Sequence, residues 1–260
     1  MYKKLSVVLG LALICLGITG AGFEINSTTG SFKIVGDAVP LGSYSNLLIV
    51  YTSANVVTVT VDSITLADSN NSGKVVNTVS VAPDISAAVG ANGPDASGLD
   101  AVSTWRSIWV ISNGTTTAGL LSASTTAPTM PSGYTYKRRV GWVKNDASSA
   151  FIPFTQRNML VQLGGGDQQV LNTGTSTTMV DIDLSAHLPS TATMTNVYLV
   201  MASGNIGYLS CKIYSRNIVG SSASESGGYW MACSTSQVIQ YKVTAGNLTL
   251  YLLGGWVDNL

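Results

Sequence analysis

Basic and aromatic side chains come together in the stretch TTAPTMPSGYTYKRRVGWVKND, residues 125–146. Aromatic rings interleaved with cations can stack sugars or bases and hold anions, so this stretch is a candidate ligand site. Strand alternation, however, divides it between two faces. The expected faces are Tyr134, Tyr136, Arg138, Val140 and Trp142 on one side, and Lys137, Arg139, Gly141 and Val143 on the other. Tyr134, Tyr136, Arg138 and Trp142 remain the candidate ligand-binding residues, but because most basic groups point away from the rings, a purely structural strand is favoured.

Two carboxylates, Asp181 and Asp183 in VDIDLS, are expected on one face of a strand. Such a pair could bind a cation or carry out the acid and base steps of glycoside hydrolysis. A retaining glycosidase needs its two carboxyl groups about 5 Å apart, and usually in a groove. No groove is evident around this strand, so a solvated strand face is favoured, with a cation site as the alternative. His187, the single histidine, lies just before a proline with no nucleophile signature nearby, which indicates a turn residue.

Cys211 and Cys233 are the two cysteines outside the N-terminal segment. In an oxidising compartment they could form a disulfide between neighbouring strands. The alternative is that both are small buried hydrophobic side chains. Neither has a cysteine or histidine at metal-ligand spacing, so no zinc site and no cofactor are expected.

The composition favours sheets and tight turns over helical bundles. Only 10% of the 260 residues are charged, against about 25% in an ordinary soluble domain, and 27 residues are glycine. The 13 basic and 13 acidic residues cancel. No overall field therefore exists to attract nucleic acid or an anionic membrane, and neither is an expected partner.

The first 22 residues, MYKKLSVVLGLALICLGITGAG, have a basic start, an apolar run and small residues at the end. This is the layout of a secretory signal, with cleavage plausible after Ala21. An uncleaved membrane anchor is the alternative, although the run is short for a bilayer, which needs about 20 apolar residues. Contact with a membrane is expected through this segment alone.

The rest of the chain predicts an all-β protein. In NVVTVTVDSITLAD, from residue 55 onward, Val57, Val59 and Val61 alternate with threonines, as in a half-buried strand. Further strand-like runs follow at intervals of roughly ten residues, separated by clusters of Ser, Asn and Gly, which is typical of a sandwich or jelly roll. We expect two β-sandwich or jelly-roll-like modules, residues 23–165 and 166–260, after the N-terminal hydrophobic segment.

Residues 98–146 resemble a module that recurs in tail-fibre-like and other virion surface proteins of bacteriophages and prophages. Its marks are Gly98-Leu99-Asp100, Thr104-Trp105, residues 118–122 (AGLLS), Pro128 with residues 131–134 (PSGY), and Arg139-Val140-Gly141. The likeness extends more loosely to residue 260. It implies a structural or adhesive β protein that forms a homotrimer, and it carries over no catalytic residues.

The function expected from these observations is that of a non-enzymatic structural protein of a virion or surface. Its roles would be those of a fibre, decoration or receptor-binding subunit, located in a virion or on the extracellular or cell surface. The expected partners are copies of itself and a host-surface glycan or other virion proteins. The alternative is a secreted carbohydrate-binding β-sandwich protein. A glycan-cleaving enzyme using Asp181 and Asp183 is the least favoured hypothesis.

Overall fold

The computed structural model describes residues 22–25, 32–35, 43–164, 168–201, 206–211, 214–220 and 228–260. Side chains are described in these ranges except within 22–25, 32–35 and 214–220. The hydrophobic segment at residues 1–21 lies outside the described residues, so the prediction of a signal or anchor stays a prediction. Within the described ranges every regular element is a strand, which confirms the all-β class. None of these residues forms a helix long and apolar enough to cross a bilayer.

The strands divide along the chain into three groups. The first pair is β1 (Gly22–Ile25) and β2 (Phe32–Val35), which form a two-stranded sheet of their own. The next group comprises β3 (Tyr44–Ser45), β4 (Leu48–Tyr51), β5 (Val57–Ala67), β6 (Gly73–Val81), β7 (Gly93–Pro94), β8 (Trp105–Ser112), β9 (Thr117–Ser122), β10 (Tyr136–Lys144), β11 (Phe154–Arg157) and β12 (Leu160–Leu163). The last group comprises β13 (Gln168–Gly174), β14 (Val180–Asp183), β15 (Ala192–Met201), β16 (Gly207–Cys211), β17 (Tyr214–Gly220), β18 (Tyr229–Ala232), β19 (Val238–Val243) and β20 (Leu248–Asp258).

One 14-stranded sheet contains strands from both of the larger groups. Its order is β18, β15, β20, β12, β11, β4, β5, β10, β8, β9 and β7, with β13 paired to β20 and with β3 and β6 paired to β5. The hairpin of β11 and β12 makes the connection, because β11 pairs with β4 while β12 pairs with β20. The sheet therefore runs continuously past residue 165, where the sequence predicts a module boundary. A four-stranded sheet, in the order β14, β19, β16 and β17, lies in the C-terminal part.

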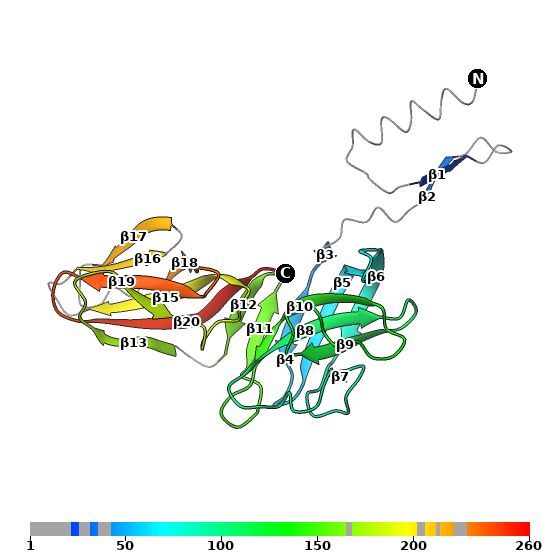
Figure 1. Ribbon diagram of the computed structural model, residues 1–260, viewed down its shortest axis with the longest axis horizontal. Coiled ribbons are helices and arrows are strands. Elements are labelled where there is room, and N and C mark those ends of the chain that lie inside the picture. Colours follow the sequence, from blue (N-terminus) through cyan, green and yellow to red (C-terminus); the bar gives the residue numbers. More distant parts are fainter. Residues whose placement is uncertain are drawn as a thin grey trace, which may run out of the picture.

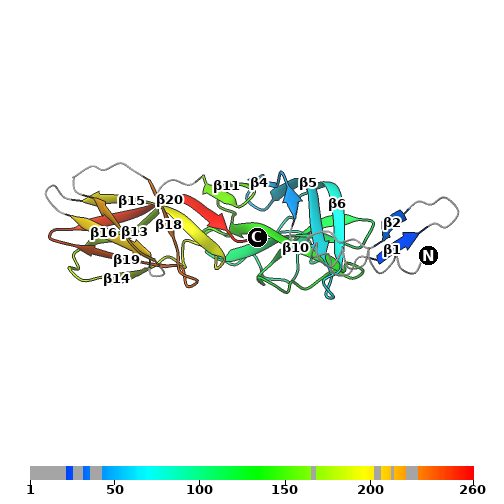
Figure 2. The same ribbon diagram turned by 90° about the horizontal axis from the view of Figure 1, so that it is seen from above.

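Two lobes lie end to end along the long axis of the molecule (Figures 1 and 2). We call the part with β3–β11 the N-terminal lobe and the part with β13–β20 the C-terminal lobe. Strand β12 lies between them, and the C-terminus lies at their junction in both views. We call this junction the joint.

The hydrophobic pattern decides which side of each strand is buried. In β5, Val57, Val59 and Val61 are buried while Thr58 and Thr60 are half-buried, as the alternation predicts. The β5–β6 turn is closed by Asp68, whose Oδ1 accepts hydrogen bonds from the backbone N–H groups of Asn70 and Ser72, each at 2.8 Å. This is the local chemistry by which an aspartate stabilises a turn.

The main hydrophobic core extends through both lobes, and it includes Val161 and Trp256 at the joint. The N-terminal lobe also contains a second, smaller cluster. It consists of Trp109, Ile111, Ala118 and Leu120, with Met130 and Tyr134 packed against it. Three of the five tryptophans, Trp109, Trp142 and Trp256, are buried. Most of the tryptophans therefore belong to the core.

Candidate functional site

A β-bulge in β10 changes the alternation of the basic and aromatic strand. Arg139 pairs with Trp109 and Gly141 pairs with Ile108, so Val140 is an extra residue without a partner on β8. A bulge of this kind shifts all later residues of the strand to the opposite face. The expected placement of Trp142 on the face of Tyr136 and Arg138 is therefore wrong.

The bulge is supported from beneath by the buried side chain of Gln156. Its Nε2 donates hydrogen bonds to the backbone oxygens of Val140, at 2.7 Å, and of Asn158, at 2.8 Å. Gly141 allows this approach, because a Cβ atom there would lie 2.3 Å from Gln156 Oε1 and 2.9 Å from Ile49 Cδ1. Glycine within a strand often marks a bulge of this kind.

Because of the bulge, cations from both parts of β10 and indole rings lie together on one side of the β8–β10 pair. Lys137 Nζ lies 5.9 Å from the ring centroid of Trp109. The Arg139 guanidinium lies 5.5 Å from the ring of Trp142, and Lys144 Nζ lies 5.6 Å from that of Trp105. All three distances lie within the range of cation–π attraction, about 6 Å.

The part of this side that carries Arg139, Trp142, Lys144 and Trp105 faces the C-terminal lobe. Arg139 Nη1 lies 2.7 Å from Asp258 Oδ2, and Arg139 also donates to the backbone oxygen of Asn259. Trp142 Nε1 donates a 2.8 Å hydrogen bond to Thr191 Oγ1, whose hydroxyl in turn donates to Asp258. The ring of Trp105 meets that of Trp256 edge-on, with centroids 5.4 Å apart.

Burial dominates the electrostatics of the joint. The side chain of Asp258 is 0% exposed and that of Arg139 is 10% exposed. Removal of the carboxylate from water raises the pKa of Asp258, against the opposing effects of Arg139, Thr191 and the Asn259 backbone N–H. Burial also lowers the pKa of Lys144, whose Nζ donates to the backbone oxygen of Ala186. The cost of burying these charges offsets much of their attraction, so we expect the ion pair to contribute more to the orientation of the lobes than to the free energy of folding.

The four candidate ligand-binding residues do not form one surface. Trp142 is only 3% exposed and belongs to the joint. Arg138 stacks on Tyr44, with its guanidinium 5.2 Å from the ring, and Tyr136 packs against the main core. Tyr134 lies before the start of β10 and packs against the smaller cluster. On the face that the bulge creates, Arg139, Trp142, Lys144 and Trp105 contact the other lobe, whereas Trp109 packs in the smaller cluster.

The acidic pair lies on β14, away from the joint. Both carboxylates are exposed; Asp181 accepts a 2.8 Å hydrogen bond from Gln240 Nε2, and Asp183 accepts one of 2.8 Å from the Ser185 backbone N–H. The bonds from Ser185 lower the pKa of Asp183. No group of three or more Asp, Glu, His or Cys side chains suited to a metal ion occurs in the part of the chain that the structure describes.

The remaining candidates are placed inside the C-terminal lobe. His187 is in a turn, as predicted, with Nδ1 2.7 Å from Gln168 Oε1, and burial lowers its pKa. Cys211 and Cys233 are both buried free thiols in the structure. Burial, together with the neighbouring Cys211, raises the pKa of Cys233 to about 12.

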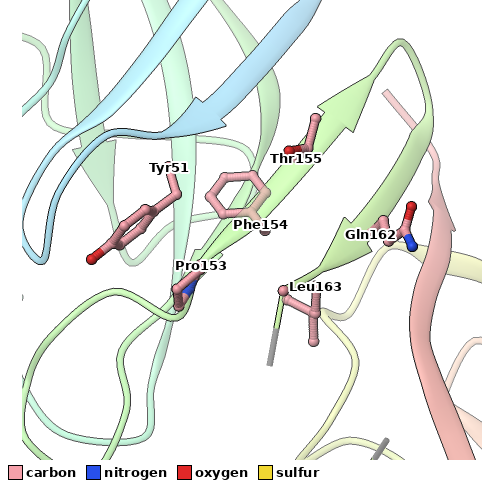
Figure 3. Close-up of a pocket in the computed structure, with 7 residues that line it drawn as sticks. Tyr51, Pro153, Phe154, Thr155, Gln162 and Leu163 are labelled. Atoms are coloured by element: carbon pink, nitrogen blue, oxygen red, sulfur yellow. The ribbon is translucent and has the colours of Figure 1, made fainter. Parts of the chain in front are cut away.

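An open pocket of about 370 Å³ lies where β4, β11 and β12 meet near the joint. Its lining is uncharged: Tyr51, Pro153, Phe154, Thr155, Gln162, Leu163 and Gly164. Figure 3 shows the rings of Tyr51 and Phe154 next to each other, and Gln162 on the neighbouring strand β12. Such a lining suits a neutral ligand with hydroxyl or amide groups rather than an ion.

Sequence reasoning missed the residues that complete the joint, namely Gln156, Thr191, Trp256 and Asp258. Gly141 is the one local signal, since a glycine inside a strand pattern indicates a bulge. Asp258 lies 119 positions from Arg139 along the chain, so no spacing rule relates them.

Replacing Gln156 by alanine tests the support of the bulge. The Gln156→Ala variant leaves the buried oxygen of Val140 and the partly buried oxygen of Asn158 without the Gln156 donor, so we expect the free energy of unfolding to fall by about 1–3 kcal/mol. Urea unfolding followed by tryptophan fluorescence measures the change. Gln162→Ala is the control, because it removes a side chain of the same type that is exposed on β12. Its expected change is within about 0.5 kcal/mol. Equal losses in the two variants would contradict this account.

The raised pKa of Asp258 predicts how stability depends on pH. Because the folded state holds its proton more tightly than the unfolded chain does, the contribution of Asp258 is fully present below its ordinary pKa and is lost as the pH rises through the raised value. Asp258→Asn cannot titrate. We therefore expect the difference in free energy of unfolding, wild type minus variant, to fall as the pH rises from about 4. A pH-independent difference, measured by urea unfolding across a pH series, would refute the prediction.

The thiols of Cys211 and Cys233 are predicted to be unreactive in the folded protein. Iodoacetamide attacks the thiolate; burial shields both thiols from the reagent, and the raised pKa of Cys233 suppresses the thiolate at that position. We expect peptide mass spectrometry to find little alkylation at either position in native protein and full alkylation in urea without reductant. Protection that persists in urea until a reductant is added would instead reveal the disulfide that the sequence allows.

Comparisons of the chain with models of known protein families, with curated proteins and with solved structures found no match.

Proposed function

We propose that this chain is a non-enzymatic structural protein of a virion or a cell surface, acting as a fibre, decoration or receptor-binding subunit. The joint is the observation that carries the proposal. Its cations and indole rings contact one another and the C-terminal lobe, with Arg139, Trp142 and Asp258 at the centre. A protein that must transmit force or hold a fixed shape benefits from two lobes that share one sheet and a buried ion pair.

The acidic residues support a non-enzymatic role. A carboxylate pair that cleaves glycosides requires one group with a raised pKa and a substrate groove beside it. Asp183 instead has a lowered pKa and, like Asp181, is exposed on β14. This combination suits a solvated strand face, where both groups stay ionised.

Assembly with further copies of the chain is part of the proposal, with a homotrimer as the favoured form. Large sheets with open edges gain stability when their edges and exposed apolar residues are covered by a second copy. Met159 and Leu160, at the turn of the β11–β12 hairpin, are large apolar side chains that remain exposed in the single chain.

Surface location and assembly can be tested together. Antiserum raised against the full chain, with gold-labelled secondary antibody, is expected to decorate the outside of intact particles or cells that carry the protein. Light scattering of the purified chain at micromolar concentration is expected to give a mass three times that of the 27.0 kDa chain. Labelling confined to the interior of lysed cells, or a monomeric mass, would contradict the location or the assembly, respectively.

A further inference from the structure

Among the residues of the C-terminal lobe whose side chains the structure describes, one side of the large sheet carries rings, amides and hydroxyls but no charged side chain. Alternation along β15 and β20 identifies it, because Thr195, Val197 and Leu252 are buried while their neighbours are half-buried. We call this side the outer face. It consists of Met194, Asn196, Tyr198, Val200, Trp230, Thr249, Tyr251, Leu253, Gly255 and Val257, and it continues onto Leu160, Gln162, Thr155 and Arg157 through the pairing of β20, β12 and β11.

Three aromatic side chains lie on the outer face. Trp230 is 43% exposed and is the only exposed tryptophan among the described residues. Its ring lies over Gly255, where an added Cβ would be 3.4 Å from Trp230 Cη2, so the missing side chain leaves room for the indole. Tyr198 and Tyr251 pair across β15 and β20 with ring centroids 6.1 Å apart and an interplanar angle of 38°. Exposed rings of this kind offer flat apolar surfaces.

Hydrogen-bonding groups lie between and beside the rings. Asn196 is directly opposite Trp230, and its buried Oδ1 accepts no hydrogen bond from any described group. Gln162 is exposed on β12 and pairs with both Gly255 and Thr155 in register. Neighbouring strands are about 4.8 Å apart, so the row from Gly255 through Gln162 to Thr155 extends over roughly 10 Å.

We propose that the outer face binds a neutral oligosaccharide, with Trp230 as the stacking platform and the exposed Gln162 and Thr155 as partners for sugar hydroxyls. The apolar side of a sugar ring fits against an aromatic face, and amide and hydroxyl groups match its rim. The row from Trp230 through Asn196, Gly255 and Gln162 to Thr155 carries no charged side chain, which matches an uncharged ligand; the exposed Arg157 lies beyond this row, opposite Leu160 at the hairpin turn. Gln162 and Thr155 also line the open pocket near Tyr51, so the site continues toward the joint.

A second copy of the chain is the competing occupant of this face. Interfaces between copies have an apolar centre, and polar groups concentrate at their rim. On the outer face, polar side chains also occur at the centre, because Asn196 lies beside Trp230 and Gln162 lies beside Gly255. Leu160, which is 49% exposed, lies at the edge of the face next to Met159 and the hairpin turn, and not at its centre. The distribution of polar groups therefore favours a sugar.

The inference rests on the proposed function, because it gives the receptor-binding role a ligand class and a place. The full chain is titrated with maltotriose, cellotriose, mannotriose and tri-N-acetylchitotriose, with saturation-transfer NMR to detect binding and calorimetry to measure affinity. At least one of the four sugars is expected to bind with a dissociation constant below about 1 mM. Trp230→Ala should weaken that binding at least about tenfold, and Trp230→Phe, which keeps a ring, by less than about threefold.

Val180→Ala is the matched control, because Val180 is an exposed apolar residue on β14 in the other sheet. It should leave sugar affinity unchanged, and unaltered circular dichroism shows that each variant folds. Binding of none of the four sugars, or unchanged affinity in Trp230→Ala, would overturn the inference. So would a Trp230→Ala variant that changes the oligomeric mass of sugar-free protein, since the face would then lie between copies. Each of these results leaves the surface-labelling test of the proposed function unaffected.

Discussion

The carboxylate of Asp258 is held out of water at the centre of the molecule, and the arrangement of the two lobes follows from the groups that surround it. A buried carboxylate is costly unless hydrogen bonds and an opposite charge compensate for the loss of water. Arg139 and Thr191 provide that compensation, and they come from opposite sides of the joint. A rotation of one lobe against the other that keeps the joint dry would break the ion pair while both charges remain shielded from water. The ion pair therefore fixes orientation, while the continuous sheet and the core around Trp256 contribute the bulk of the stability.

Local structure could be predicted from the sequence, whereas the contacts of the joint could not. The alternation of Val57, Val59 and Val61 correctly predicts β5, and the low charge and high glycine content correctly predict an all-β protein. These signals depend on periods of two residues and on turn chemistry, both of which act within a few positions. The face of Trp142 is not predictable in this way, because one unpaired residue at Val140 reverses it. The pairing of Arg139 with Asp258 depends on the meeting of two distant strands, which no local pattern encodes.

Aromatic residues serve two different purposes in this chain. Trp142 and Trp256 are buried at the joint, where their rings contact Arg139 and Trp105. Trp230, in contrast, is exposed to solvent on the outer face, where it pairs with Asn196. The composition does not distinguish the two groups of rings. Burial does, because the rings at the joint are shielded from solvent and Trp230 is exposed. A low overall charge suits both uses, because neither a dry joint nor a neutral binding face tolerates many unpaired ions.

The bulge at Val140 also suggests how such a joint could arise during evolution. A regular strand with the same residues would carry Trp142 on one side and Arg139 on the other, as strict alternation requires. Insertion of a single codon at this point turns every following side chain over, so that Trp142 and Lys144 join Arg139 on one surface in one genetic step. Substitution alone would have had to exchange each of those positions separately. The single extra residue at Val140 thus determines which side chains form the contact surface between the lobes, and Gly141 and Gln156 accommodate it.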